Sequence, residues 1–186
     1  MEEHSILWRD LANDGKDLLN VVQTSRGWLL NGTILTTLNR DPCKINYRIE
    51  CDIAWLTREV AVDIYSPSVS RRVFLTADGE RRWHLNGEEM PELFGCTDID
   101  LEFTPASNTL PIRRLNLEVG ATARIKAAWL KFPKLAIEAA DQEYHRVEER
   151  LYKYSSRGGE FETPVEVNDF GLVARYPGQW EIVETA

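Results

Sequence analysis

Apolar and polar residues alternate along much of the chain, which is the pattern of half-buried β-strands. In residues 44–51, one face carries the apolar side chains Ile45, Tyr47, Ile49 and Cys51. Residues 57–65 and 161–167 alternate in the same way, and clusters of Gly, Asn and Asp separate the short segments. The pattern therefore predicts a mainly β protein built from many short strands.

The segment 70–87 is typical of a β-hairpin. Asp78-Gly79 separates two apolar-rich stretches, 70–77 and 80–85, and this dipeptide favours a two-residue loop. Such a loop predicts that Phe74 lies opposite Trp83 and that Val73 lies opposite His84. Asn86-Gly87 indicates the next turn.

Residues 109–117 interrupt the β pattern and predict one short helix. Pro111 stands near its start, where a helix tolerates proline, and Asn108 or Thr109 can serve as N-cap. Gly120 is suited to end the segment. Because the helix is mostly apolar, we expect it to be buried.

Residues 135–154 are open to two interpretations. The spacing of three and four between their apolar residues favours a helix, and these are Ile137, Ala140, Tyr144, Val147, Leu151 and Tyr154. The alternative is two strands, 134–145 and 148–155, with a turn near Arg146-Val147. Further on, 161–178 repeats the strand–turn–strand pattern of 73–87, so an internal duplication of two β halves stands beside a simple meander.

Composition and charge narrow the function classes. The chain has 186 residues, and 22 Lys+Arg against 30 Asp+Glu give a net charge of −8, which argues against nucleic-acid binding. No apolar run approaches the ~20 residues of a membrane helix, and the first residues lack a signal peptide's apolar region. We expect one domain over residues 1–186, in the cytoplasm, that is not an integral membrane protein.

Cysteine and histidine spacing gives no zinc-site pattern. The three cysteines, Cys43, Cys51 and Cys96, form no CxxC pair, and the three histidines stand apart, so reduced thiols are the simpler interpretation. No nucleophile elbow, P-loop or dinucleotide motif occurs. We predict no catalytic residue, no metal and no cofactor.

Four charged residues around the predicted helix are the first candidate site. Asp98 and Asp100 alternate and so share a strand face, where a pair of carboxylates can hold a divalent cation. Arg113 and Arg114 lie inside the apolar helix, where an unpaired guanidinium is costly. They require either an internal carboxylate, for which Asp98 and Asp100 are the candidates, or a sugar or phosphate head group.

Asp52, Trp55 and Arg58 form a second candidate cluster. A Trp flanked by polar groups is suited to stack on a sugar ring, although an ordinary core Trp fits the same pattern. Together with Asn108, these three and the four residues above are the predicted ligand-binding set.

The segment 95–115 resembles the bacterial family named "putative glycolipid-binding", chiefly through the string NTLPIRRL at 108–115. Ala106 departs from the pattern, where a larger residue is expected. Further matching stretches are Trp8-Arg9, Gly32, Tyr47 to Asp52 with Trp55 and Arg58, Gln142 with Tyr144, Asp169 to Val173, and Tyr176 to Gly178. The resemblance implies a spiral β-roll, a long curled antiparallel sheet around a single helix, and a homodimer. It therefore implies strands at 135–154.

Three functions follow as hypotheses. The first, which the resemblance implies, is binding of a glycolipid or another acylated small molecule inside the rolled sheet. The second is a metal-assisted enzyme acting on a sugar or phosphate through Asp98 and Asp100. The third is a dimeric interaction module without a small ligand, because long curled sheets leave edges that dimerisation covers.

Overall fold

Fifteen strands within residues 2–183, the part of the chain that the computed structural model describes, hydrogen-bond into one continuous sheet. Alternating burial confirms the predicted strand faces: Ile45, Tyr47 and Ile49 are at most 2% exposed. The strands are β1 Glu3–Asp10, β2 Lys16–Thr24, β3 Gly27–Leu38, β4 Asp41–Cys51, β5 Thr57–Tyr65, β6 Ser70–Ala77, β7 Trp83–Leu85, β8 Glu88–Glu89, β9 Asp98–Leu101, β10 Thr122–Leu130, β11 Ile137–Glu148, β12 Leu151–Ser156, β13 Phe161–Val167, β14 Val173–Tyr176 and β15 Trp180–Ile182.

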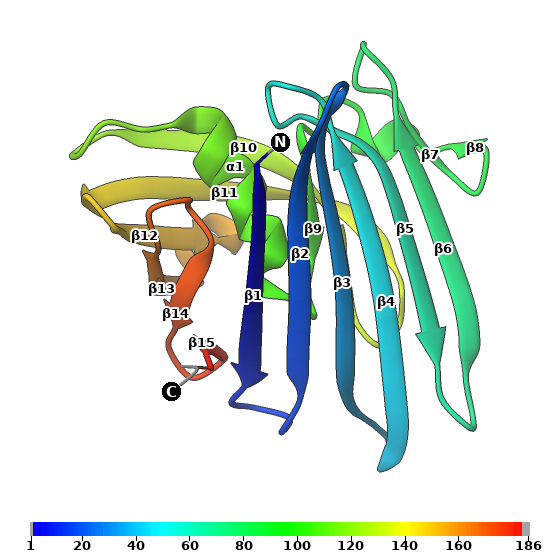
Figure 1. Cartoon of the computed structure of the whole chain (residues 1–186). Coiled ribbons are helices and arrows are strands. Elements are labelled where there is room, and N and C mark those ends of the chain that lie inside the picture. Colours follow the sequence, from blue (N-terminus) through cyan, green and yellow to red (C-terminus); the bar gives the residue numbers. More distant parts are fainter. Residues whose placement is uncertain (1, 184–186) are drawn as a thin grey trace.

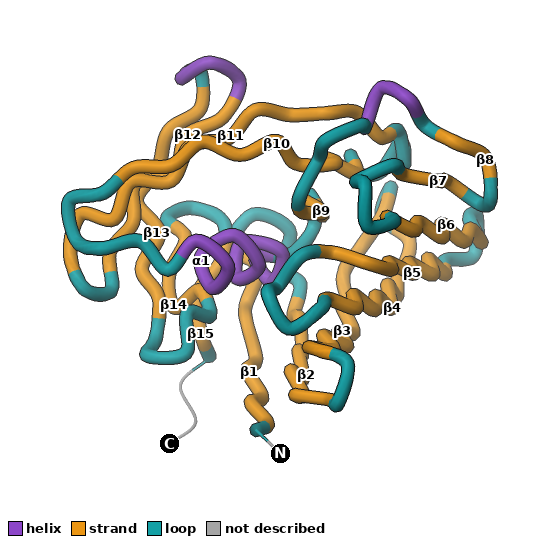
Figure 2. Tube along the Cα trace, turned by 90° about the horizontal axis from the view of Figure 1, so that it is seen from above, coloured by secondary structure: helices purple, strands orange, loops and turns teal. Residues whose placement is uncertain are grey.

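The chain builds the sheet in two halves that meet at its centre. β1 lies at the centre, and the strands follow one another outward to β8 at one edge. The chain then crosses to β9 at the opposite edge and returns through β10 to β15, which pairs with β1. Figures 1 and 2 show the resulting curl, with the helix α1 (Thr109–Leu115) inside it. This confirms the predicted mainly β roll around one short helix.

One pair of strands is parallel, which corrects the expectation of a wholly antiparallel sheet. β9 runs parallel to β10, from Asp98 opposite Ala127 to Leu101 opposite Leu130. A parallel pair needs a crossover connection, usually through a helix, and α1 lies in this connection. The helix therefore belongs to a β–α–β unit at the edge of the sheet.

The curl brings the β9 edge near the start of β5 without closing a barrel. Thr57 Oγ1 accepts a hydrogen bond from the Ile99 amide at 3.0 Å. Nearby, the Trp83 indole donates to the Cys96 carbonyl, also at 3.0 Å. These contacts hold the segment before α1 against the far wall of the roll.

The helix begins as predicted but ends earlier. A 3₁₀ turn, Pro105–Asn108, leads into it, and Thr104 Oγ1 caps that turn by accepting from the Ala106 amide. Asn116 ends the helix in the left-handed conformation, with its amide donating to the Ile112 carbonyl. Asparagine tolerates this conformation, so the predicted extension to 117 and the role of Gly120 as the terminating residue are wrong.

The predicted register of the 70–87 hairpin is also wrong. Trp83 lies opposite Ala77, and Phe74 pairs instead with Ala61 on β5. The cause is the Asp78 carboxylate, which accepts from the amides of Glu80 and Arg82 and builds a longer loop. The side chain thus replaces the tight turn that Asp-Gly usually forms.

Residues 135–154 form strands β11 and β12, not a helix. The connection lies at residues 149–150, after the predicted Arg146-Val147 turn. β11 pairs with β10 from Ile137 to His145, and with β12 on its other side from Gln142 to Glu148. Long-range pairing therefore overrides the local helical spacing. The single domain over 1–186 and the internal duplication stay predictions.

Candidate functional site

A polar cavity of about 160 Å³ lies inside the roll at the N-terminal end of α1. Its wall comes from β9, the turn before α1, and the strands from β10 to β15. Its polar side chains include Asp100, Asn108 and Gln142, and aromatic rings from Trp129, Tyr154, Phe161, Tyr176 and Trp180 line it as well. A few polar groups among aromatic rings in a concave site are typical of small-molecule binding.

Asp100 lies at the centre of the polar groups in this cavity. Gln142 Nε2 donates to its carboxylate at 2.6 Å and Ser107 Oγ at 3.3 Å. Burial raises the pKa of Asp100 to about 6, although both hydrogen bonds act in the opposite direction. Above that pH the group is a fixed carboxylate acceptor.

Asn108 is positioned by Tyr144. Its Nδ2 donates to the Tyr144 hydroxyl at 3.0 Å. Burial raises the pKa values of Tyr144, Tyr154 and Tyr176 well above that of free tyrosine. The phenols therefore stay protonated at neutral pH and remain able to donate hydrogen bonds.

An apolar cavity of about 430 Å³ adjoins the polar one. Glu102, Gln179 and Trp180 line both. The remaining wall of the apolar cavity comes from the β1–β2 loop, the β3–β4 end and the segment after β10. Its apolar residues include Ile34, Leu38, Ile45, Phe103 and Phe132, and its polar residues are Asp10, Asn13, Thr36, Thr37 and Asn39. The two cavities together form a site that is more polar at one end and more apolar at the other.

Asp17 is a buried carboxyl behind Thr104, a residue that lines the polar cavity. The hydroxyl of Thr104 donates to it at 2.5 Å and that of Tyr47 at 2.9 Å. Burial raises the pKa of Asp17 to about 7, and the two hydrogen bonds only partly offset this. Tyr47 reaches it because its ring crosses Gly32, where a Cβ would lie 1.9 Å from Tyr47 Cζ.

The raised pKa of Asp17 predicts an unusual dependence of stability on pH. The unfolded carboxyl titrates near 3.8 and the folded one near 7, so the folded state binds more protons between these values and the free energy of unfolding falls as pH rises from 4 to 7. Asp17→Asn should be more stable than the wild type at pH 8 and should remove most of this slope. Urea unfolding at pH 5, 6.5 and 8 measures it, and an unchanged slope in the variant would contradict the assignment.

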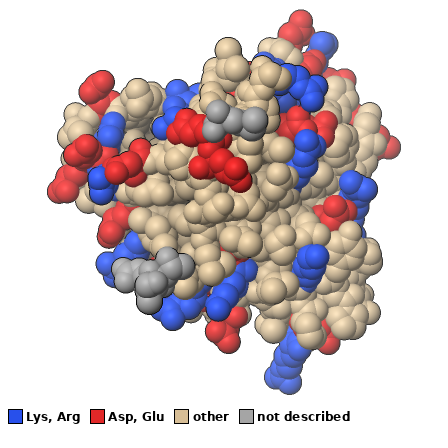
Figure 3. Space-filling model, in the orientation of Figure 1, with Lys and Arg blue, Asp and Glu red and all other residues tan. Residues whose placement is uncertain are grey.

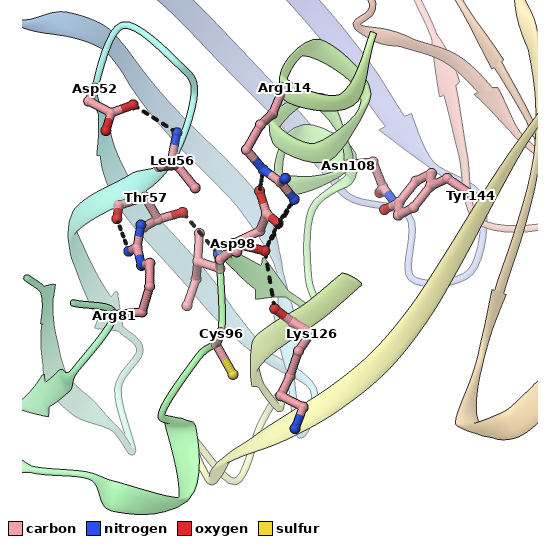
Figure 4. A network of polar contacts seen from close by, with 12 residues as sticks. Asp52, Leu56, Thr57, Arg81, Cys96, Asp98, Asn108, Arg114, Lys126 and Tyr144 are labelled. Atoms are coloured by element: carbon pink, nitrogen blue, oxygen red, sulfur yellow. Dashed lines mark hydrogen bonds and ion pairs between the residues drawn. The ribbon is translucent and has the colours of Figure 1, made fainter. Parts of the chain in front are cut away.

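Asp98 and Arg114 form the internal ion pair that the sequence offered as one alternative. Arg114 Nη2 lies 2.5 Å from Asp98 Oδ2, and Nε donates to Oδ1 at 3.1 Å (Figure 4). The Asp98 side chain is 1% exposed and that of Arg114 is 16% exposed. The pair attaches α1 to β9.

Asp98 and Asp100 do not share a cation site. Asp98 binds Arg114, whereas Asp100 binds Gln142 and Ser107. In residues 2–183, no group of three His, Cys, Asp or Glu side chains is placed to hold a metal. The three cysteines are free and buried, and burial raises the pKa of Cys96 to about 11.

The Asp52, Trp55 and Arg58 cluster lies apart from both cavities. Asp52 accepts from the amides of Ala54 and Leu56 and forms an ion pair with Arg58 at 2.7 Å. This closed loop places Trp55, at φ 65°, against Trp28 with ring centroids 4.5 Å apart. Trp55 is 5% exposed, so its ring packs on protein in this structure.

Of the predicted site residues, Asp100 and Asn108 line the polar cavity, and the other six lie elsewhere. Arg113 lies in the last turn of α1, away from the polar cavity, and its guanidinium lies over the Phe170 ring. Sequence reasoning gave no site role to Gln142, Tyr154 and Tyr176. Gln142 is a polar residue at a buried position of β11, and such a residue indicates a site. The helical interpretation of 135–154 did not place it on a buried strand face.

The fold and its interior site define an open β-roll with a cavity that is more polar at one end and more apolar at the other. The family model described as "Putative glycolipid-binding" matches residues 5–181, and the chain belongs to this family. A crystal structure of a DUF1089 family protein from Pseudomonas aeruginosa is similar to it, with 30% sequence identity and a TM-score of 0.80. The similarity covers 90% of this chain and 92% of that one. A search of curated proteins gives no match.

Proposed function

We propose that the protein binds a glycolipid, or a similar amphipathic molecule, with the head group in the polar cavity and the hydrocarbon chain in the apolar cavity. The observation that carries this proposal is the junction of the two cavities through Glu102, Gln179 and Trp180. The family description supports the ligand class. No helix in residues 2–183 has the length and apolar character needed to cross a membrane.

The polar cavity is suited to a sugar rather than to a simple polar group. The Asp100 carboxylate and the Gln142 amide are 2.6 Å apart, so together they offer neighbouring hydroxyls both acceptors and donors. Trp129 and Phe161 line the cavity, and aromatic rings of this kind are suited to contact the apolar side of a sugar ring. Because these groups are fixed by hydrogen bonds or packing, little ordering is required on binding.

The apolar cavity is suited to a hydrocarbon chain. Its volume of about 430 Å³ lies within the range of about 300–1,000 Å³ usual for ligand sites. Phe103 and Phe132 contact each other at a centroid distance of 5.7 Å and form one side of it. Each buried methylene of a ligand would contribute about 0.8 kcal/mol.

A tryptophan in the polar cavity should abolish binding. Ala140 lines this cavity and Asp141, the next residue of β11, is exposed, so Ala140→Trp fills the site whereas Asp141→Trp places the same ring outside. A glycolipid at 100 times its Kd stabilises the folded state by about 2.7 kcal/mol. The expected rise in Tm is therefore roughly 5–10 °C for the wild type and Asp141→Trp, and near zero for Ala140→Trp.

The lipid panel for this experiment holds a glycolipid, its free sugar and a fatty acid, each at equal concentration. The proposal predicts the largest rise in Tm for the glycolipid, because it fills both cavities. Equal behaviour of the two tryptophan variants, or no response to any member of the panel, would overturn it.

The proposal extends to a cytoplasmic homodimer. The sheet ends at β8, which is exposed, whereas the β9 edge packs against β5, and a second copy can cover an exposed edge such as that of β8. Light scattering of the protein as it elutes from a size-exclusion column should give twice the chain mass of 21.4 kDa. The monomer mass at micromolar concentration would contradict this.

The alternative of a metal-assisted enzyme has no support from Asp98 and Asp100, which bind separate partners. The face in Figure 3 carries interspersed positive and negative side chains, and the lack of nucleic-acid binding stays a prediction.

A further inference from the structure

A separate hollow of about 100 Å³ lies at the C-terminal end of α1 and shares no lining residue with the polar cavity. We call it the arginine pocket. It lies between the helix end, the β11–β12 turn and the β13–β14 turn. Its charged lining residues are Arg113, Arg146 and Arg150 with Glu149 and Asp169, so three positive charges face two negative ones in a chain whose net charge is −8.

Within residues 2–183, the hydrogen-bond partners of Arg146 are backbone carbonyls and include no carboxylate. Its Nη1 donates to the Leu117 carbonyl at 2.6 Å, and its Nη2 donates to the Glu149 carbonyl at 2.6 Å. These bonds fix the guanidinium plane but leave its charge unneutralised. Each η nitrogen keeps a further proton to donate.

Arg113 is fixed by aromatic rings and a carbonyl. Its Nη1 donates to the Phe170 carbonyl at 3.1 Å, and its guanidinium carbon lies 4.4 Å from the Phe170 ring centroid. Its Nε is buried and has no hydrogen-bond partner within residues 2–183. Gly171, at φ 93°, leaves room for this side chain, since a Cβ there would lie 3.2 Å from Arg113 Cδ.

The remaining polar groups of the pocket include the Asn168 amide, which adds a hydrogen-bond donor, and an ion pair between Arg150 and Asp169. Asn168 Oδ1 accepts from the amides of Phe170 and Leu172, which leaves its Nδ2 as a donor. Arg150 forms an ion pair with Asp169 at the exposed rim. Asp169 is therefore paired with Arg150, and within residues 2–183 Glu149 forms no ion pair with Arg113 or Arg146.

We propose that the arginine pocket binds the phosphate group of a small phosphomonoester or of inorganic phosphate. Guanidinium groups recognise phosphate oxygens through paired, charge-assisted hydrogen bonds. The fixed guanidinium groups of Arg113 and Arg146, together with the Asn168 amide, are suited to bind a phosphate group. The proposal is independent of the glycolipid site, because the two sites share no residue.

Phosphate titration of the full chain tests the proposal. Inorganic phosphate is raised to 20 mM at constant ionic strength, balanced with sodium chloride, and Tm and the ³¹P NMR linewidth are both followed. We expect saturable binding in the wild type and in Arg124→Gln, a control at an exposed arginine outside the pocket. Arg146→Gln and, separately, Arg113→Gln should weaken binding about tenfold or more.

The linewidth reports binding even if a variant changes stability, so a shifted Tm alone does not decide the result. Co-sedimentation with phosphatidylcholine vesicles, with and without phosphatidic acid, distinguishes a lipid phosphate from free phosphate as the source. No saturable response to either source, or equal binding by the Arg146→Gln and Arg124→Gln variants, would overturn the proposal. The Ala140→Trp variant should keep its phosphate response, so failure of the glycolipid site remains distinguishable.

Discussion

Replacing Arg114 by methionine is expected to lower the free energy of unfolding by about 3–5 kcal/mol, the usual cost of removing one partner of a buried ion pair. The Asp98 side chain is 1% exposed, and both of its carboxylate oxygens accept from Arg114. The substitution keeps most of the apolar stem but leaves a buried carboxylate without its cation. For a chain of 186 residues, Tm should fall by roughly 10 °C.

Two further variants separate the ion pair from simple loss of an arginine. Arg124 forms an ion pair with Glu143 on the surface, where its side chain is 86% exposed, so Arg124→Met should lower the free energy of unfolding far less than Arg114→Met does. The double variant Asp98→Asn with Arg114→Met should recover much of the loss, because no unpaired charge remains. Urea unfolding of the wild type and the three variants measures these differences, and equal losses in Arg114→Met and Arg124→Met would contradict our account.

Replacing Gly32 by alanine is expected to destabilise the protein by about 3 kcal/mol or more. The new Cβ would lie 1.9 Å from Tyr47 Cζ and 2.3 Å from Tyr47 Oη. The ring would have to move, and its buried hydrogen bond to Asp17, 2.9 Å long, would be lost with it. A small residue in the middle of β3 therefore positions a side chain next to the polar cavity.

Gly79→Ala is the matched control, because a Cβ there meets nothing within 4 Å, and we expect a change within ~0.5 kcal/mol. In a Tyr47→Ala background, Gly32→Ala should cost far less, since the ring that it meets is gone. Chemical unfolding of the four variants checks this. A Gly32→Ala loss that does not depend on Tyr47 would mean that the ring is not the obstacle.

The sequence predicts best where a strand has one buried and one exposed face. β4 and β5 alternate cleanly, and their buried faces were predicted correctly. β11 does not alternate: within it only Gln142 and Tyr144 are fully buried. Its strand conformation comes from pairing with β10 and β12, which local spacing cannot reveal.

The candidate site shows the same limit. Asp100 was predicted as a candidate because it shares a strand face with Asp98 and could pair with the helix arginines, and Asn108 was added to the set from the string NTLPIRRL. Gln142, Tyr154 and Tyr176 join them only because the sheet curls back on itself. A convergence of strands so far apart in sequence depends on the tertiary fold, which the pattern of single strands does not contain.

Native mass spectrometry of the protein, purified from cells without detergent or organic solvent, tests the central claim most directly. We predict a mass above that of the bare chain by that of one amphipathic molecule per chain, with the added molecule absent from Ala140→Trp and present in Asp141→Trp. Bare protein in all three samples, together with no uptake of added glycolipid by the wild type, would contradict a ligand-binding role for the interior of the roll.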